Sequence, residues 1–82
     1  MDVTEIEQLL QSALTLDELH VTFDGSQCKV IAVADFFDEL PRVKRQQMVY
    51  APLMEAINAG KIHAVTIKTF SKAQWQRDKL FN

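Results

Sequence analysis

Apolar and polar residues alternate along two segments in the first half of the chain, and this alternation predicts two β-strands. Residues 19–24 change from apolar to polar one by one, the pattern of a half-buried strand. Residues 28–34 are apolar on both faces, which is typical of a central strand covered on both sides. Between them lies an Asp-Gly-Ser turn signal at residues 24–26. The two strands are therefore expected to form a hairpin.

A helical spacing of apolar residues predicts a helix from Met1 to Ala13. Two pairs of residues fit its start equally well, Asp2 with Glu5 and Thr4 with Glu7, because each joins a capping residue to an acid three positions later. The apolar stripe consists of Val3, Ile6, Leu9, Leu10 and Ala13.

The longest helix is predicted over Arg42–Asn58, with Gly60 just past its end. Pro52 lies inside it and removes a backbone donor, which predicts a kink or a local break. The preceding residues 35–41 show no periodicity and are expected to form a short irregular turn. The expected buried stripe of the helix is Val43, Val49, Tyr50, Leu53, Ala56 and Ile57.

Residues 62–75 predict a strand joined directly to a helix. Alternation places His63, Val65 and Ile67 on one face of the strand. Ser71 with Gln74 fits a capping box, and Phe70 with Trp75 fits a hydrophobic staple, so Trp75 is expected to be buried. The full order is helix, strand, strand, turn, helix, strand, helix. A strand–helix–strand crossover joins parallel strands, which predicts one α+β domain over residues 1–82, with helices packed on a three-stranded mixed sheet.

Composition agrees with a small globular protein: 48% of the 82 residues are hydrophobic, 24% are charged, and the net charge is −2. The single cysteine, Cys28, excludes an internal disulfide. Without an apolar run long enough to span a bilayer, and without a basic segment followed by a hydrophobic one near the N-terminus, the expected protein is soluble and cytoplasmic.

Charge is distributed unevenly along the chain. Residues 1–40 hold nine carboxylates and one base, whereas residues 41–82 hold eight bases and two acids. Arg42, Lys44 and Arg45 open the longest helix, where positive charge opposes the helix dipole. They indicate either an anionic partner, a phosphate or an acidic protein, or simply a solvated surface.

Catalytic templates fit the sequence poorly, so a protein that is not an enzyme is expected. Its two glycines cannot form a glycine-rich phosphate loop, and no histidine lies at a diagnostic spacing from Ser26 or Cys28. His63 is interpreted as a structural histidine or as a metal ligand exposed at the end of the sheet. Cys28 is interpreted as a small buried apolar residue or as a thiolate ligand. Together with His63 it supplies half of a tetrahedral site, which a partner would complete.

Three segments carry a resemblance to a known family: HVTFDGSQCKVIAV, FFDELPRVKRQQMVYAPLMEAI and KIHAVTIKTFSKAQW. Together they cover most of the chain and resemble the BolA family, more closely its small bacterial IbaG-like (YrbA-like) branch. The resemblance implies a KH-like (class II) αββαβα sandwich, in agreement with the element order above.

The resemblance also implies two functions. One is an adaptor that binds a monothiol glutaredoxin and shares a [2Fe-2S] cluster with it and with glutathione, in iron–sulfur trafficking or in sensing iron or stress. His63 falls on the cluster-ligating histidine of the family. Close relatives carry a histidine where this chain has Gln27, so the adjacent Cys28 is the candidate second ligand. The isolated chain is expected to bind no cluster and to be a monomer or weak dimer.

The alternative is a stress-response transcription regulator that binds DNA through a basic surface made of Arg42, Lys44, Arg45 and Lys68. A KH-like module normally clamps nucleic acid with a Gly-X-X-Gly loop, and this sequence contains none. The adaptor is therefore the preferred function.

Overall fold

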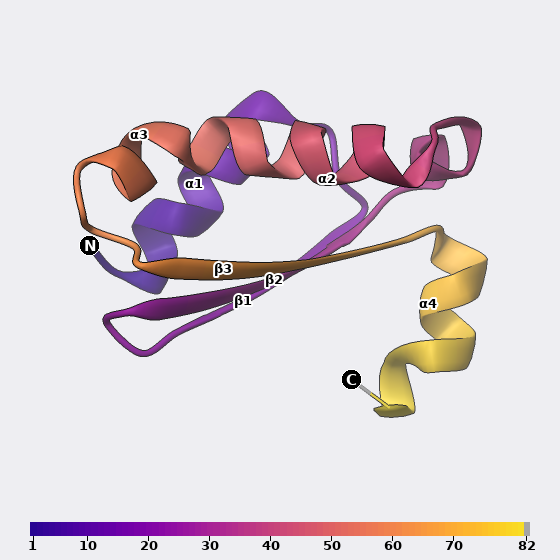
Figure 1. The fold of residues 1–82 in the computed structure, drawn as a ribbon. Helices are drawn as coiled ribbons and strands as arrows, with labels where there is room; N and C mark the ends of the chain where they lie inside the picture. The colour runs from indigo at the N-terminus through magenta and orange to yellow at the C-terminus, as the bar shows by residue number, and fades with distance from the viewer. Residues whose placement is uncertain (82) are drawn as a thin grey trace.

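The computed structural model describes residues 1–81, and its centre is a mixed sheet in the order β1-β2-β3. β1 and β2 are antiparallel, whereas β2 and β3 are parallel, as the crossover predicts (Figure 1). The predicted αββαβα order is confirmed; the predicted domain also includes Asn82, which lies outside the described residues. The helices and strands are α1 (Val3–Ala13), β1 (Glu18–Phe23), β2 (Gln27–Val33), η1 (Asp35–Glu39), α2 (Arg42–Tyr50), η2 (Ala51–Leu53), α3 (Met54–Asn58), β3 (Ala64–Phe70), α4 (Lys72–Asp78) and η3 (Lys79–Phe81).

The hairpin between β1 and β2 turns at the predicted place. Gly25 has φ 95°, a conformation that glycine adopts without a steric penalty. One oxygen of Asp24 accepts hydrogen bonds from the backbone N–H groups of Ser26 and Gln27, at 2.9 and 2.6 Å. These bonds lower the pKa of the Asp24 carboxyl below its ordinary value, the bond from Gln27 having the larger effect.

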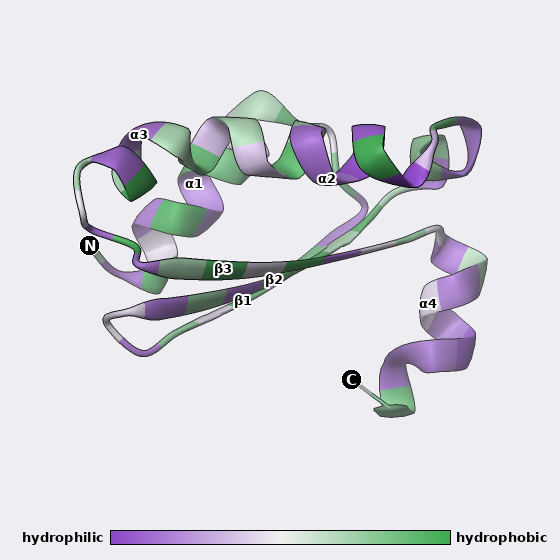
Figure 2. Ribbon diagram, viewed as in Figure 1, coloured by the Kyte–Doolittle hydropathy of each residue, from purple (hydrophilic) through white to green (hydrophobic). Residues whose placement is uncertain are grey.

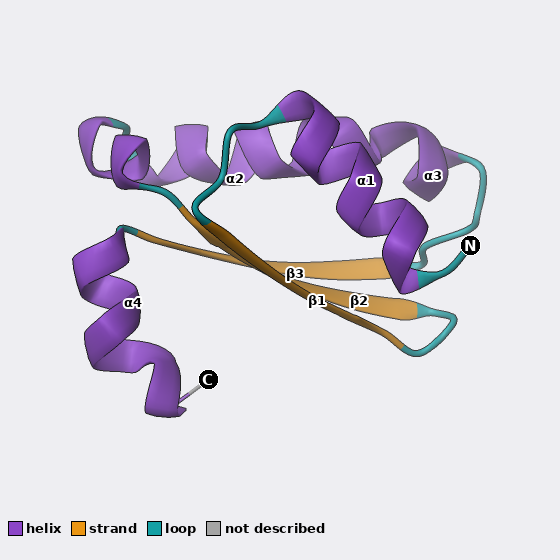
Figure 3. Ribbon diagram, turned by 180° about the vertical axis from the view of Figure 1, so that it is seen from behind, coloured by secondary structure: helices purple, strands orange, loops and turns teal. Residues whose placement is uncertain are grey.

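One face of the sheet packs against α1, α2 and α3 and forms the main core (Figures 1 and 3). Strand alternation directs every second residue of each strand to this side. The green segments of Figure 2 mark the apolar residues along these elements. The buried members of the main core are Ile6, Leu10, Cys28, Val30, Ala32, Ala34, Phe37, Val49, Leu53, Ala56 and Ile62.

Among residues 1–81, the other face is covered at one end by α4, which packs against it after β3 (Figure 1). Trp75 is 7% exposed and packs with Ile31 and Val33 in a second, smaller cluster. The rings of Phe70 and Trp75 lie 5.4 Å apart, so the predicted staple and the burial of Trp75 are confirmed.

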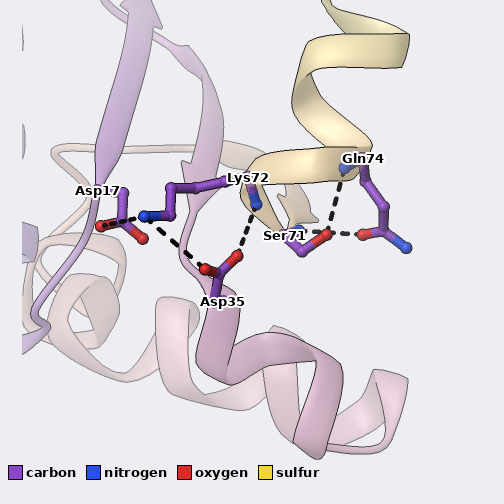
Figure 4. Close-up of polar contacts among 5 residues, drawn as sticks. All are labelled: Asp17, Asp35, Ser71, Lys72 and Gln74. Atoms are coloured by element: carbon purple, nitrogen blue, oxygen red, sulfur yellow. Dashed lines mark hydrogen bonds and ion pairs between the residues drawn. The ribbon is translucent and has the colours of Figure 1, made fainter.

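Polar contacts hold the start of α4 against the sheet (Figure 4). The Ser71 hydroxyl accepts from the Gln74 backbone N–H, and the Gln74 side chain accepts from the Ser71 N–H, which confirms the capping box. The backbone N–H of Lys72 donates to the Asp35 carboxylate at 3.0 Å. The side-chain ammonium of Lys72 lies 3.8 Å from the Asp35 carboxylate and 4.0 Å from that of Asp17. Three separate segments are thereby joined at one end of the sheet.

Helix boundaries confirm some predictions and correct others. Asp2 and Glu5 form the capping box of α1, which decides between the two predicted starts. The long helix is interrupted by the 3-10 turn η2 around Pro52, so the predicted local break is confirmed. Val43 and Tyr50, which were expected in the buried stripe, are 65% and 36% exposed, and that prediction is wrong. The described part of the chain includes no helix with the length and hydrophobicity needed to cross a bilayer.

Candidate functional site

His63 lies in the turn that leads into β3 and is exposed to solvent. The prediction that it belongs to the strand is wrong by one residue, because pairing with β2 begins at Ala64. Its backbone N–H donates to the Ser26 carbonyl at 2.8 Å. This bond fixes the backbone at His63 to the hairpin turn, while its imidazole stays on the surface.

Cys28 lies at the same end of the sheet but points into the main core. It pairs with Val65 in β3 and with Phe23 in β1, and it is only 3% exposed. Burial raises the pKa of its thiol above the ordinary value, because a thiolate is poorly solvated there. Metal ligation requires the thiolate. The structure therefore favours the interpretation of Cys28 as a small apolar residue.

Of the two candidate metal ligands at this end of the sheet, only His63 is accessible to solvent. His63 offers an accessible imidazole, whereas Cys28 would first have to leave the core. Among residues 1–81, no group of three or more histidine, cysteine, aspartate or glutamate side chains is arranged to hold a metal ion. A partner would have to supply the remaining ligands.

The second candidate site is a groove of about 570 Å³ along the outer edge of β3, between α2 and α4. It brings together the cations Arg42, Arg45 and Lys68, with the carboxylate of Asp78 at the α4 side. Lys44, the fourth residue of the predicted basic surface, does not line it. Helical spacing explains the difference, because Arg42 and Arg45 are three residues apart and share a face that Lys44 leaves.

Two polar contacts shape this groove. The Gln46 side-chain amide donates to the Ile67 carbonyl at 3.0 Å, at the edge of β3. The Arg45 Nε donates to the Leu40 carbonyl at 2.9 Å, which holds that guanidinium group beside the start of α2. Gln46 lies beside the predicted basic residues in the sequence, but nothing in a helical glutamine indicates that a strand edge 21 residues away will accept its hydrogen bond.

His20 is a further residue whose surroundings the sequence did not reveal. Its ring lies 5.1 Å from that of Trp75, and its Nε2 is 3.9 Å from Glu18. Alternation placed His20 on the polar face of β1, which is correct, but the arrival of α4 on that face depends on the tertiary fold.

The fold and these sites define a small α+β protein with an exposed histidine at one end of its sheet and a basic groove along one edge. A family model described as BolA-like protein matches residues 10–74. The acid stress protein IbaG of Escherichia coli strain K12 is 51% identical over 82 residues, covering 100% of this chain and 98% of the relative. An uncharacterized protein of Haemophilus influenzae is 42% identical, covering 100% and 96%. The chain belongs to the BolA family, in its IbaG-like branch.

Solved structures of the same family share the fold. A Bol-like protein from Babesia bovis superposes with a TM-score of 0.80 at 22% identity, covering 96% of this chain and 94% of that one. BolA1 from Arabidopsis thaliana gives a TM-score of 0.76 at 26% identity, covering 87% and 92%. The family resemblance and the fold class predicted from the sequence are both confirmed.

Proposed function

We propose that this protein is a BolA-type adaptor that binds a monothiol glutaredoxin and contributes His63 to a [2Fe-2S] cluster shared by the two proteins. The observation that carries the proposal is the position of His63, which is exposed at the end of the sheet while its backbone is bonded to the hairpin turn. A role in a stress response fits the name of the Escherichia coli relative, an acid stress protein.

His63 would act as a fixed donor in such a complex. The backbone bond to Ser26 limits the movement of the residue, so little ordering is needed when a partner arrives. A shared cluster would supply redox chemistry, and replacing a thiolate ligand with imidazole raises the potential of such centres. The exposed residues around the turn, Asp24 to Gln27, would lie at the contact with the partner.

Cys28 stays a predicted second ligand. In this structure its thiol is buried and its pKa is raised, so ligation would require the sheet end to open and the thiol to ionise. The geometry favours a first complex in which His63 is the donor from this chain and the partner with its glutathione supplies the others.

The test is cluster reconstitution with a monothiol glutaredoxin and glutathione without oxygen, followed by visible circular dichroism of the mixture. The parent is expected to give a spectrum different from that of the glutaredoxin alone. His63→Ala should return the spectrum to that of the glutaredoxin or lose the cluster. His20→Ala is the matched control, because it removes the only other histidine, also exposed, from a different place.

An unchanged spectrum for His63→Ala would refute the ligand assignment. Cys28→Ser separates the two models of the second ligand. A spectrum like the parent's indicates that Cys28 does not ligate, whereas loss of the mixed spectrum in a variant that remains folded indicates that it does.

A second candidate function, binding of DNA, is favoured by the groove that collects Arg42, Arg45 and Lys68. Three cations around one concave surface suit a phosphate backbone, and binding should weaken steeply as salt rises, because neutralised phosphates release counterions. The carboxylate of Asp78 in the same groove opposes this function, which is why it ranks second.

Two basic residues in the first turn of α2 offer a matched pair for testing DNA binding by the groove. Arg42→Glu and Lys44→Glu make the same change of charge at the start of α2, but only Arg42 lines the groove. If the groove binds DNA, Arg42→Glu should weaken binding about 10-fold or more in an anisotropy titration, and Lys44→Glu should weaken it much less. Equal effects would show that binding depends on net charge and not on the groove.

A further inference from the structure

An exposed seam of three apolar residues and one glutamine runs along the outer side of α2 and the start of α3. Val43, Tyr50 and Met54 are 65%, 36% and 46% exposed, and the exposed Gln47 lies between the first two. Residues 43, 47 and 50 are four and three positions apart and share one face of α2, and the exposed Met54 begins α3 just beyond the η2 turn. This is the alternating spacing by which one helix packs against another. The seam is defined as these four residues, each of which is exposed in the part of the chain that the structure describes.

Charged residues flank the seam at its two ends. Lys44 directly follows Val43, and Glu55 directly follows Met54. Both are exposed, and among the described residues neither side chain takes part in an ion pair. They are eleven positions apart, about three helical turns, and each directly follows a seam residue, which places both on the same side of the seam. Lys44 is therefore a positive flank at one end of the seam and Glu55 is a negative flank at the other, where Lys61 lines the same hollow as Glu55.

We propose that the seam is an interface at which two copies of this chain pair with their α2–α3 segments antiparallel. A two-fold axis near the middle of the seam would place Val43 against Met54 of the second copy and Gln47 against Tyr50 of the second copy. In that arrangement Lys44 lies beside Glu55 of the second copy, and the same contact is made twice. A parallel two-fold pairing would place Lys44 and Glu55 of the second copy at opposite ends of the seam and would form neither contact. The charge pattern thus selects a second copy in one orientation.

The size of the seam sets the strength of this association. The segment Arg42–Asn58 has 17 residues, about 25 Å of helix, with three apolar side chains available from each copy. Such a contact buries less than the roughly 1,200 Å² of a standard stable interface, so the dimer is weak and depends on concentration. His63 does not belong to the seam, so the seam variants keep the proposed cluster ligand in place.

Sedimentation of the isolated protein tests the interface, over concentrations from about 10 μM to about 1 mM, the range for a weak contact. The parent is expected to shift from monomer toward dimer. Val43→Glu and Met54→Glu should each keep the protein monomeric throughout. Leu80→Glu is the matched control, since Leu80 is 86% exposed and lies outside the seam, and it should dimerise like the parent. Far-ultraviolet circular dichroism confirms that each variant is folded.

A charge exchange tests the orientation. Lys44→Glu alone places two acids at each end of the two-fold contact, and Glu55→Lys alone places two bases there. Each should weaken dimerisation about 3-fold or more, whereas the double variant should recover the association of the parent and lose it with added salt. A parent that stays monomeric at every concentration would overturn the proposal, as would a double variant that is weaker than both single ones. Dimerisation unaffected by the seam variants would also overturn it.

Discussion

Burial separates the chemistry of Cys28 and His63, although they lie at the same end of the sheet. The backbone alternation of β2 turns Cys28 into the main core, while His63 precedes the first residue of β3 and remains on the surface. A buried thiol resists ionisation, and an exposed imidazole is available to a partner. The two residues therefore differ in role because of where their backbones place them.

The raised pKa of Cys28 predicts a change of stability at alkaline pH. The unfolded thiol ionises near pH 8.5, whereas the folded one holds its proton to higher pH. As the pH rises above that value, the unfolded state loses protons first, so the free energy of unfolding should fall by up to about 1.4 kcal/mol per pH unit until the folded thiol ionises. Below that range the contribution is fully present.

Urea unfolding of the parent and of Cys28→Ala between about pH 7 and pH 10 measures this effect, because all other titrating groups are shared. The difference between the two free energies of unfolding should be constant at neutral pH and shrink above about pH 8.5. Two parallel curves would show that the core does not shield the thiol.

At the scale of elements, short signals in the sequence determine where helices begin and break. Pro52 cannot donate a backbone hydrogen bond, and the helix tightens into η2 around it before continuing as α3. β3 ends at Phe70 and α4 starts at Lys72, with only the capping residue Ser71 between them. Because Ser71 is itself buried at the junction, its cap joins the strand to the helix at a fixed angle.

Loss of that cap should destabilise the protein measurably. Ser71→Ala removes the hydroxyl that accepts from the Gln74 N–H and is expected to lower the free energy of unfolding by about 1 kcal/mol in urea titrations. Ser12→Ala is the control, since Ser12 is an exposed serine inside α1 where alanine is a better helix former. If both variants unfold at the same urea concentration, the capping box does not stabilise α4.

At the scale of the whole molecule, the two faces of the sheet carry cores of unequal size. The main core contains eleven buried residues, whereas the cluster under α4 contains three. From α4 itself only Trp75 is buried. A segment with few buried contacts opens locally at a lower free energy than the central strands do.

Native-state hydrogen exchange should therefore report two levels of protection. Amides of β2, the central strand, are expected to exchange through global unfolding, and those of α4 about 10-fold faster or more. Asp35→Ala removes the acceptor of the Lys72 N–H and should speed amide exchange in α4. The difference in exchange rate between α4 and β2 should then be larger than in the parent. Equal opening free energies in α4 and β2 would show that the molecule unfolds as one unit.

The sequence by itself determined the order of the elements, the hairpin turn, the parallel crossover, the break at Pro52, both capping boxes in outline and the burial of Trp75. These features depend on residues near one another in the chain, whose spacing and backbone preferences act locally. Tertiary structure decided what distant segments do to each other. It left Val43 and Tyr50 exposed because the sheet covers only one side of the long helix, and it placed Cys28 in the core. It also brought Arg42 and Arg45 into one groove with Lys68 and left Lys44 outside that groove. Only side chains on the helix face toward β3 can reach that strand.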